Sequence, residues 1–380
     1  MKIAILTGGG DVSPLNAVIR SVIDTCEKTG TELYGIRKGW EGLLSGDFIK
    51  LNGLIINPLI GGTILKSSRV NLAKIKEGSN QVLSALKRQG IDGLIVIGGE
   101  DTLSNALYLK DFPKILISKT IDNDVGRYSE GKFLNYFTLG HPTAADKISS
   151  FVSFQEGLRT TAYSHERIIV VESMGMHAGW LALSSSSGNP DFIIIPEFPL
   201  KYSEFAERVK DRFLEQRNVI IVISEGAKWE DGSYISADDT EKDSFGHPRF
   251  RGTAELLAKK LKTDLSSSFD TRNVNAVNPS YLYRSGQPNA LDHEMAKKTG
   301  SESVNRLLSA TSDSVFLSNV LTRDGFNVEP FLFDSLDNIE QFHRFVDSSL
   351  YDALEFKATS IAKEYFSTIS KQYPAVNISF

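Results

Sequence analysis

The chain has 380 residues, more than one hydrophobic core usually organises, so two domains are expected. Hydrophobic residues make up 41% of the sequence and charged residues 23%, which excludes a disordered or fibrous chain. The 42 Lys and Arg against 47 Asp and Glu give a net charge of −5, without any basic block, so nonspecific nucleic-acid binding has no electrostatic support. Cys26 is the only cysteine and no apolar run is long enough to span a membrane, so we expect a cytoplasmic protein without a membrane partner.

Short β-branched runs alternate with amphipathic stretches along the chain. The expected strands are residues 3–7, 93–97, 114–118, 167–172, 192–195 and 219–224. Helices are expected at residues 14–28, 79–88, 104–109 and 203–216. Continuous apolar strands separated by helices predict an α/β fold, in which mainly parallel sheets are covered on both faces.

Two later stretches have a different composition. Residues 228–251 are polar and acidic, which is typical of a surface loop or lid. The C-terminal segment that includes residues 345–373 is rich in Phe and Tyr, and we expect it to form helices that dock on the body of the protein.

Two glycine-rich turns follow expected strands. In Gly8–Asp11 the backbone N–H groups can cradle a phosphate, although a simple tight turn before a helix would use the same residues. The second turn, Gly98–Thr102, adds the acidic pair Glu100 and Asp101. Such carboxylates either cap the following helix or bind Mg²⁺ beside a phosphate, since Mg²⁺ prefers one or two carboxylates together with phosphate oxygens.

A third polar turn, Lys119–Asp124, follows the strand at residues 114–118 and contains two carboxylates two residues apart. Asp122 is the candidate general base toward a hydroxyl, and Lys119 can neutralise charge on a transferring phosphoryl group. Arg69, after another glycine turn, is either a further phosphate-binding cation or a solvated surface residue. Ligands bind at the carboxyl ends of the strands in open α/β sheets, so these turns together predict a single phosphoryl-transfer site.

Taken together, these residues resemble the phosphofructokinase family. The matching stretches occur in the family's order over roughly residues 1–310, and they are GGGDVSPLNAVIR, GWEGLL, GGTILKSSR, IGGEDTLSNA, KTIDND, TLGHPTAADKI, SHERIIVVESMG, ISEGA and YLYRSGQPNALD. The resemblance implies two Rossmann-like three-layer α/β domains with the active site in the cleft between them. It implies a phosphate donor-binding domain, residues 1–135 with 284–335, and a sugar phosphate-binding domain, residues 136–283 with 336–380. A homodimer or homotetramer is implied as well.

The implied reaction is Mg²⁺-dependent phosphoryl transfer to the 1-hydroxyl of fructose 6-phosphate. By resemblance, Asp122 is the proton acceptor, Lys119 and Arg69 are the further catalytic residues, and Glu100 is the Mg²⁺ ligand. The implied donor-binding residues are Gly9, Gly99, Asp101 and Thr102. The implied substrate-binding residues are Thr120, Asp122, Arg167, Met174, Gly175, Met176, Glu225, Tyr281 and Arg284. Among these, Arg167 resembles the arginine that reaches the sugar phosphate of a neighbouring subunit.

Asp101 and Lys119 bear on the identity of the donor. ATP-using members generally carry a glycine at the position of Asp101, whereas pyrophosphate-using members resemble this chain there. A carboxylate beside the α-phosphate of ATP would add volume and like-charge repulsion, and a short donor leaves charge that a lysine can neutralise. The sequence therefore predicts a reversible, pyrophosphate-dependent phosphofructokinase of glycolysis, and an ATP-dependent enzyme is the alternative.

Two positions depart from the family pattern. Met176 stands where the family usually has an arginine, and Asp292–His293 stands where the family has an Asp-Arg pair. These departures leave open another acceptor, such as sedoheptulose 7-phosphate, and also a noncatalytic phosphosugar-binding homologue.

Overall fold

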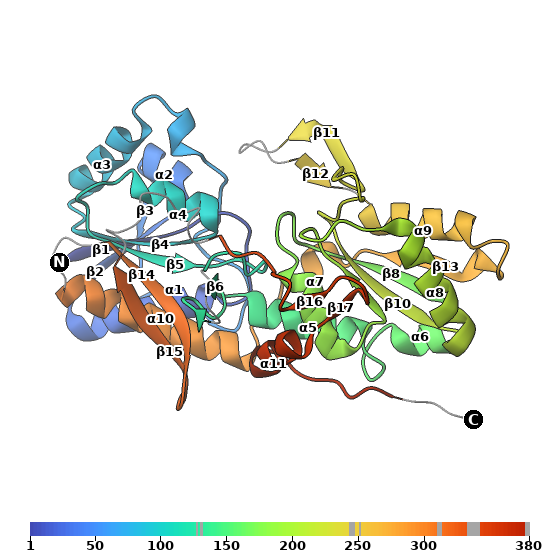
Figure 1. The fold of residues 1–380 in the computed structure, drawn as a ribbon. Helices are drawn as coiled ribbons and strands as arrows, with labels where there is room; N and C mark the ends of the chain where they lie inside the picture. The colour runs from blue at the N-terminus through green and yellow to red at the C-terminus, as the bar shows by residue number, and fades with distance from the viewer. Residues whose placement is uncertain are drawn as a thin grey trace. The chain divides into compact units, whose positions relative to one another are not determined.

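The computed structural model describes residues 1–126, 128–129, 132–242, 248–250, 252–309, 314–332 and 343–376. The chain forms two compact units, each made of two segments of sequence. The first unit comprises Met1–His141 and Arg284–Arg344, and the second comprises Pro142–Tyr283 and Phe345–Phe380. Both units have an α/β architecture (Figure 1), which confirms the predicted fold class.

The first unit is built on a seven-stranded sheet with the strand order β15-β14-β5-β4-β1-β2-β3. Its parallel strands are β1 (Lys2–Thr7), β2 (Glu32–Ile36), β4 (Gly93–Gly98), β5 (Lys114–Ser118) and β14 (Ser314–Thr322). Antiparallel strands close the two edges, namely β3 (Phe48–Lys50) and β15 (Gly325–Leu332). The central strands β4 and β5 are buried along their whole length, which explains their continuous apolar sequences.

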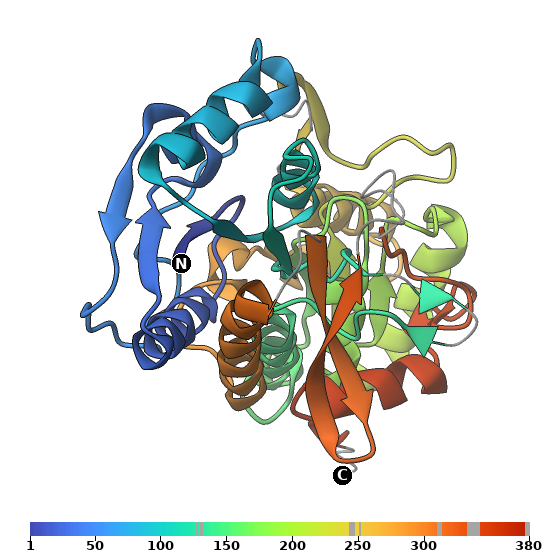
Figure 2. The same cartoon turned by 90° about the vertical axis from the view of Figure 1, so that its left-hand side faces the viewer.

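Helices cover both faces of this sheet (Figure 1). One face carries α2 (Gly39–Ser45), α3 (Gly78–Gln89) and α4 (Glu100–Leu107), and the other carries α1 (Leu15–Thr29) and α10 (Ala290–Ser309). Figure 2 shows α1 and α10 side by side. They approach so closely at Gly300 that a Cβ atom there would lie 2.7 Å from the carbonyl oxygen of Val18, so this pair of helices requires a residue without a side chain.

The second unit contains a four-stranded parallel sheet with the order β13-β8-β10-β9. Its strands are β8 (Ile168–Ser173), β9 (Phe192–Ile194), β10 (Val219–Ser224) and β13 (Val274–Val277). Its helices are α5 (His141–Val152), which starts one residue before the unit boundary, α6 (Arg159–Ser164), α7 (Trp180–Ser184), α8 (Tyr202–Gln216), α9 (Thr253–Asp264) and α11 (Ser360–Ile369). The apolar sides of α8 and α9 pack on one face of the sheet and form its main core.

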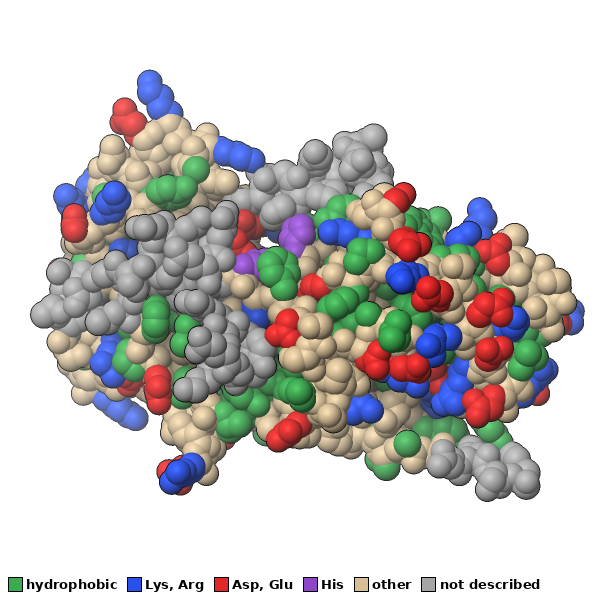
Figure 3. Space-filling view, in the orientation of Figure 1, with side chains coloured by type: hydrophobic (Ala, Val, Ile, Leu, Met, Phe, Trp, Pro, Cys, Tyr) green, Lys and Arg blue, Asp and Glu red, His purple; other side chains and the backbone are tan. Residues whose placement is uncertain are grey.

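Charged side chains of both signs are interspersed over the visible face of the second unit (Figure 3). Among the helices in the described part of the chain, none is both long enough and apolar enough to cross a membrane.

Most predicted elements agree with the structure. The strands predicted at residues 114–118 and 219–224 have these same bounds, and the other four strands differ by one residue at most at either end. Three of the four helices are equally close. The fourth, α4, begins at Glu100 rather than at residue 104, because the acidic pair of GGEDT lies inside its first turn.

The prediction for residues 228–251 was wrong in part. This segment contains an antiparallel ribbon of β11 (Ala237–Lys242) and β12 (Pro248–Phe250), while residues 243–247 and 251 lie outside the described part of the chain. The sequence of β11, ADDTEK, lacks the apolar alternation on which strand prediction relies, so only its backbone pairing reveals it.

The prediction of several C-terminal helices was also wrong. In the described part of the C-terminal segment, α11 is the one helix, and it follows a short hairpin of β16 (Tyr351–Asp352) and β17 (Lys357–Ala358). The Asp352 carboxylate shapes this hairpin, because it accepts hydrogen bonds from the backbone N–H groups of Leu354 and Glu355 at 3.0 Å each.

Candidate active site

Three turns that carry predicted site residues are adjacent in the first unit, because β1, β4 and β5 are neighbours in its sheet. The turn after β1 begins at Gly8, whose N–H donates to the carbonyl of Ile97 in β4 at 2.9 Å. The turn after β5 begins at Lys119, whose N–H donates to the carbonyl of Gly98 at 2.9 Å. The structure therefore brings the glycine turns and the acidic turn to one edge of the sheet.

A cavity of about 640 Å³, here called the glycine cavity, opens at the turn after β1. It is lined by Gly9, Gly10, Asp11, Gly61, Gly62, Thr63, Lys66, Ser67, Ser68, Arg69 and Arg284. Arg284 forms an ion pair with Asp11, with 3.2 Å between Nε and the carboxylate oxygen. Cationic side chains around a glycine-rich backbone are the features of a phosphate-binding site.

Gly9 and Gly10 let the cationic ends of Lys119 and Arg284 approach the backbone. Gly9 has a φ of 76°, in the left-handed region, and a Cβ atom there would lie 3.5 Å from the Nζ atom of Lys119. At Gly10 a Cβ atom would lie only 2.7 Å from an Nη atom of Arg284. A side chain at either position would occupy the space beside a cationic group, so the turn needs glycine for its conformation and for this close approach.

Lys119 is buried beneath the glycine turn, and its ammonium group donates a hydrogen bond to the carbonyl of Gly10. Burial, together with the positive charges of Arg284 and Arg69, lowers the pKa of Lys119 to about 8, against the opposing effect of Asp11 and Asp122. The ammonium is thus a poorly compensated cation, and an anion bound beside it would restore its preference for the charged form.

The turn at Lys119–Asp124, here called the acidic turn, carries Asp122, and hydrogen bonds from neighbouring residues fix its shape. The backbone N–H of Asp122 donates to the hydroxyl of Thr120 at 3.1 Å, and Thr120 in turn accepts at its carbonyl from the hydroxyl of Thr138 at 2.6 Å. The ring of His141 donates from Nδ1 to the carbonyl of Ile121 at 2.7 Å. Burial lowers the pKa of His141 to about 3, so this ring is neutral and serves as a fixed donor to the turn.

Glu100 and Asp101 lie in the first turn of α4, directly after Gly99. The Glu100 carboxylate pairs with Nδ1 of His343 at 2.8 Å. Thr102, in the same turn, is buried, and its hydroxyl would lie 3.6 Å from a Cβ atom at Gly9. Within the described part of the chain, no three His, Cys, Asp or Glu side chains are grouped so that they could hold a metal ion.

A second group of predicted residues lies in the second unit, where two loops follow neighbouring strands. Met174–Met176 follows β8, and Glu225 follows β10. The N–H of Gly175 donates to the Glu225 carboxylate at 3.2 Å. Gly226 packs so tightly on this loop that a Cβ atom there would lie 1.9 Å from the carbonyl oxygen of Met176. Met174, Gly175, Met176 and Glu225 are therefore brought together.

Arg167 lies apart from the Met174–Met176 loop, whereas Tyr281 belongs to a turn whose Tyr283 hydroxyl donates to the carbonyl of Glu172, near the end of β8. Arg167 precedes β8, so it lies at the opposite end of this six-residue strand, about 20 Å away. It donates a hydrogen bond to the hydroxyl of Thr161 at 2.9 Å. Tyr281, in a short 3₁₀ turn at Ser280–Tyr283, is 62% exposed. Within one chain, the structure does not bring Arg167 to the loops at the carboxyl ends of the strands.

Several residues of these sites were missed by the sequence reasoning. Lys66 and Ser67 line the glycine cavity beside Arg69, and the glycine pair that precedes them in GGTILKSSR was the available signal. His343 pairs with Glu100 and Arg344 donates to the carbonyl of Asn123, both from a distant part of the sequence, and no local pattern indicates them. Glu172, at the end of β8, is buried, accepts a hydrogen bond from Asn278 at 2.6 Å, and has a pKa raised by burial.

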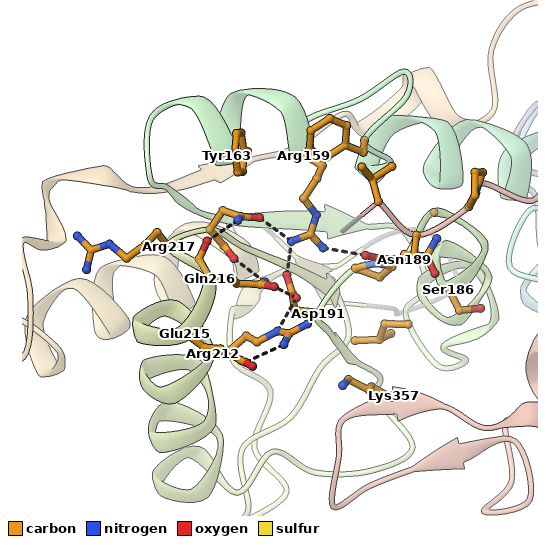
Figure 4. Close-up of a pocket in the computed structure, with 18 of the residues that line it drawn as sticks. Arg159, Tyr163, Ser186, Asn189, Asp191, Arg212, Glu215, Gln216, Arg217 and Lys357 are labelled. Atoms are coloured by element: carbon orange, nitrogen blue, oxygen red, sulfur yellow. Dashed lines mark hydrogen bonds and ion pairs between the residues drawn. The ribbon is translucent and has the colours of Figure 1, made fainter. Parts of the chain in front are cut away.

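A larger cavity, of about 900 Å³, lies in the second unit and is lined by residues of α6 and α8 (Figure 4). Asp191, which is 4% exposed, is the centre of its polar network. The carboxylate accepts from Arg159 at 2.5 Å, from Arg212 at 3.0 Å and from Gln216 at 2.8 Å. It also accepts from the backbone N–H of Ile220 at 2.8 Å. One buried carboxylate thus holds two arginines and the start of β10.

Replacing Asp191 with Ala is expected to lower the free energy of unfolding of the second unit by about 3–5 kcal/mol, because it leaves Arg159 buried without its carboxylate partner. The melting temperature should fall by roughly 10 °C, which differential scanning calorimetry measures. The matched control is Glu355→Ala, which removes the exposed partner of Arg208 and should cost about 1 kcal/mol or less. An equal effect of the two substitutions would contradict the role of Asp191.

Comparison with known proteins places these features in one family. The family described as Phosphofructokinase matches residues 2–307. A pyrophosphate--fructose 6-phosphate 1-phosphotransferase from Streptomyces coelicolor is 37% identical over 311 residues, which cover 80% of this chain and 86% of the relative. The ATP-dependent 6-phosphofructokinase 3 of the same organism is 36% identical over 307 residues, which cover 79% of this chain and 85% of that relative.

A solved structure shares the fold along the whole chain. The pyrophosphate-dependent phosphofructokinase from Nitrosospira multiformis superimposes with a TM-score of 0.78 at 19% identity, covering 100% of this chain and 94% of that one, a likeness that concerns the fold alone. The sequence relatives include users of both donors at nearly equal identity, so overall identity does not distinguish pyrophosphate from ATP. The family match and the extent of these alignments nevertheless agree: the chain belongs to the phosphofructokinase family.

Proposed function

We propose that the protein transfers a phosphoryl group from pyrophosphate to the 1-hydroxyl of fructose 6-phosphate, and that it also catalyses the reverse reaction. The observation that carries the choice of donor is a pair of side chains, one at the glycine turn after β1 and one in the turn after β4. Lys119 places a buried ammonium at the carbonyl of Gly10, and Asp101 places a carboxylate in the first turn of α4. A short, highly charged donor suits the Lys119 ammonium. The Asp101 carboxylate would occupy space that a nucleotide's α-phosphate would need.

The donor would bind at the glycine cavity, which Gly9 and Arg69 line, and we assign Gly99 and Thr102 of the neighbouring turn to its phosphates as well. Glu100 would hold Mg²⁺, and it fits this ion because it offers carboxylate oxygens beside a phosphate-binding turn. When bound, the ion would offset negative charge on the donor oxygens.

In the proposed transfer, Asp122 accepts the proton of the sugar 1-hydroxyl as its oxygen forms a bond to phosphorus. The bond between this phosphorus and the bridging oxygen of pyrophosphate breaks, and inorganic phosphate leaves. Lys119 and Arg69 stabilise the charge on the transferring group, so positioning and electrostatics supply the acceleration without a covalent enzyme intermediate.

The proposed function also needs residues that bind the sugar phosphate. We assign this role to Thr120, Met174, Gly175, Met176, Glu225, Tyr281 and Arg284, and to Arg167 of a neighbouring subunit. The placement of Arg167 at the amino end of β8 supports its action in a partner's site, since it is distant from the loops of its own chain. A homodimer or homotetramer is therefore part of the proposal.

A direct assay of donors tests the proposed function. Initial rates are measured with Mg²⁺ and fructose 6-phosphate, with either pyrophosphate or ATP as the donor and with sedoheptulose 7-phosphate as a second acceptor. We expect turnover with pyrophosphate and fructose 6-phosphate. Equal or faster turnover with ATP would overturn the donor assignment, and ligand binding without turnover on any pair would indicate a noncatalytic homologue.

The rate at limiting pyrophosphate is expected to fall as the pH rises through about 8. Burial lowers the pKa of Lys119 to about 8, and only its protonated form carries the charge that binds the donor. A lysine with the ordinary pKa of 10.5 would keep its charge over this range. In Lys119→Met this fall should be absent, and the rate at pH 7 should already be low. An unchanged pH profile in that variant would contradict the role of Lys119.

A further inference from the structure

Two consecutive residues near the C-terminus, His343 and Arg344, connect the two acidic elements of the first unit. Both lie beyond residues 2–307, the part of the chain that matches the family. Their backbone runs beside the acidic turn, because His343 forms an antiparallel bridge with Val125 and the N–H of Arg344 donates to the carbonyl of Asp124 at 2.7 Å. A segment more than 200 residues away in sequence thus lines the turn that carries Asp122.

Arg344 anchors this segment. Its side chain is 1% exposed, and its guanidinium group donates to backbone carbonyls on both sides of the turn. Nε and one Nη atom donate to the carbonyl of Asn123 at 2.9 and 2.8 Å, and the other Nη atom donates to the carbonyl of Asn135 at 2.6 Å. Asn123 has a φ of 56°, a left-handed conformation that costs energy outside glycine, so these bonds stabilise the shape of the turn.

His343 extends from the same anchored backbone to the other acidic element. Its Nδ1 atom lies 2.8 Å from a carboxylate oxygen of Glu100, at the start of α4, and its side chain is only 15% exposed. The bond joins a residue fixed on the acidic turn after β5 to the acid that follows β4. It therefore holds the Glu100 carboxylate at a set position relative to the turn that carries Asp122.

We infer that His343 is a positioning residue, which orients the Glu100 carboxylate toward a divalent cation bound with the phosphate donor. The inference rests on the proposed function, in which Glu100 is the cation ligand. A partner that hydrogen-bonds a ligating carboxylate fixes its orientation, and losing such a partner typically costs about 10- to 100-fold in metal affinity or activity.

The test compares His343→Leu, which removes the donor but keeps similar bulk, with His343→Asn, whose amide can place an N–H near the position of Nδ1. Mn²⁺ binding is measured by electron paramagnetic resonance in the presence of methylenediphosphonate, a pyrophosphate analogue that is not turned over. We expect His343→Leu to weaken Mn²⁺ binding by about tenfold or more, and His343→Asn to recover most of the loss. The half-saturating Mg²⁺ concentration for turnover should shift in the same order.

A matched control removes another donor to a carboxylate in the same unit. Arg306 pairs with Glu302 on α10 at 2.6 Å, and Arg306→Leu should leave Mn²⁺ binding unchanged. Melting temperatures of all variants separate positioning from folding, since a purely structural role would lower stability without changing the cation affinity of the folded protein.

Three outcomes would overturn the inference. These are unchanged Mn²⁺ binding in His343→Leu, an equal loss in His343→Asn, and wild-type protein that does not bind Mn²⁺. A wrong donor assignment would be seen separately, as turnover with ATP in the donor assay, and the same comparison among the variants would then use a nonhydrolysable ATP analogue in place of methylenediphosphonate.

Discussion

Asp122→Ser is expected to lower kcat by about 10²-fold or more, while the affinity for fructose 6-phosphate stays within roughly threefold. The carboxylate is proposed to accept the proton of the 1-hydroxyl, and serine cannot do so at neutral pH. The turn itself should survive the change, because the hydrogen bond from residue 122 to Thr120 uses its backbone N–H. Steady-state kinetics in both directions, together with equilibrium binding of the sugar phosphate, provide the measurement.

Two further variants sharpen this prediction. Asp122→Asn keeps the shape of the side chain but removes the base, and it should be as slow as the serine variant. Asp24→Ser removes a carboxylate from the surface of α1, where it pairs with Arg20, and should leave kcat close to that of the wild type. Near-normal turnover in Asp122→Asn would remove Asp122 from the proposed role.

The second prediction concerns the donor. Asp101→Gly, combined with Lys119→Gly, is expected to raise the ratio of ATP to pyrophosphate use by roughly 10²-fold. Two like charges about 4–6 Å apart near a protein surface repel by a few kcal/mol, and removing the side chain also releases volume. Losing Lys119 should in addition weaken pyrophosphate binding, because the buried ammonium near the glycine turn is removed. The measurement is kcat/KM for each donor at saturating fructose 6-phosphate.

Single substitutions separate the physical causes of this change. Asp101→Asn removes the charge but keeps the volume, so a gain in ATP use there would assign the effect to repulsion. Asp101→Gly alone removes both, and a gain seen only in that variant would assign the effect to space. Glycine in the first turn of α4 costs about 1 kcal/mol of helix stability, which the melting temperature reveals. If neither the single nor the double variant gains ATP use, the steric and electrostatic account of the donor is wrong.

Local sequence patterns were sufficient to predict the strands and helices that carry the proposed site. The runs 114–118 and 219–224 are continuously apolar because both faces of each strand are buried, and this burial leaves a signal in the sequence. The glycine and acidic turns were recognisable because each directly follows a predicted strand, at the end where open α/β sheets bind ligands.

The tertiary structure alone decided which of these turns meet and what holds them. The order β5-β4-β1 places three turns side by side, and nothing local in the sequence sets that order. His343 and Arg344 contact Glu100 and Asn123 through hydrogen bonds that span more than 200 residues, and the short stretch around them has no periodicity. The charged ribbon of β11 and β12 was missed because it is defined by backbone pairing. Side-chain periodicity records burial within a segment, whereas pairing between distant segments depends on backbone groups that every residue shares.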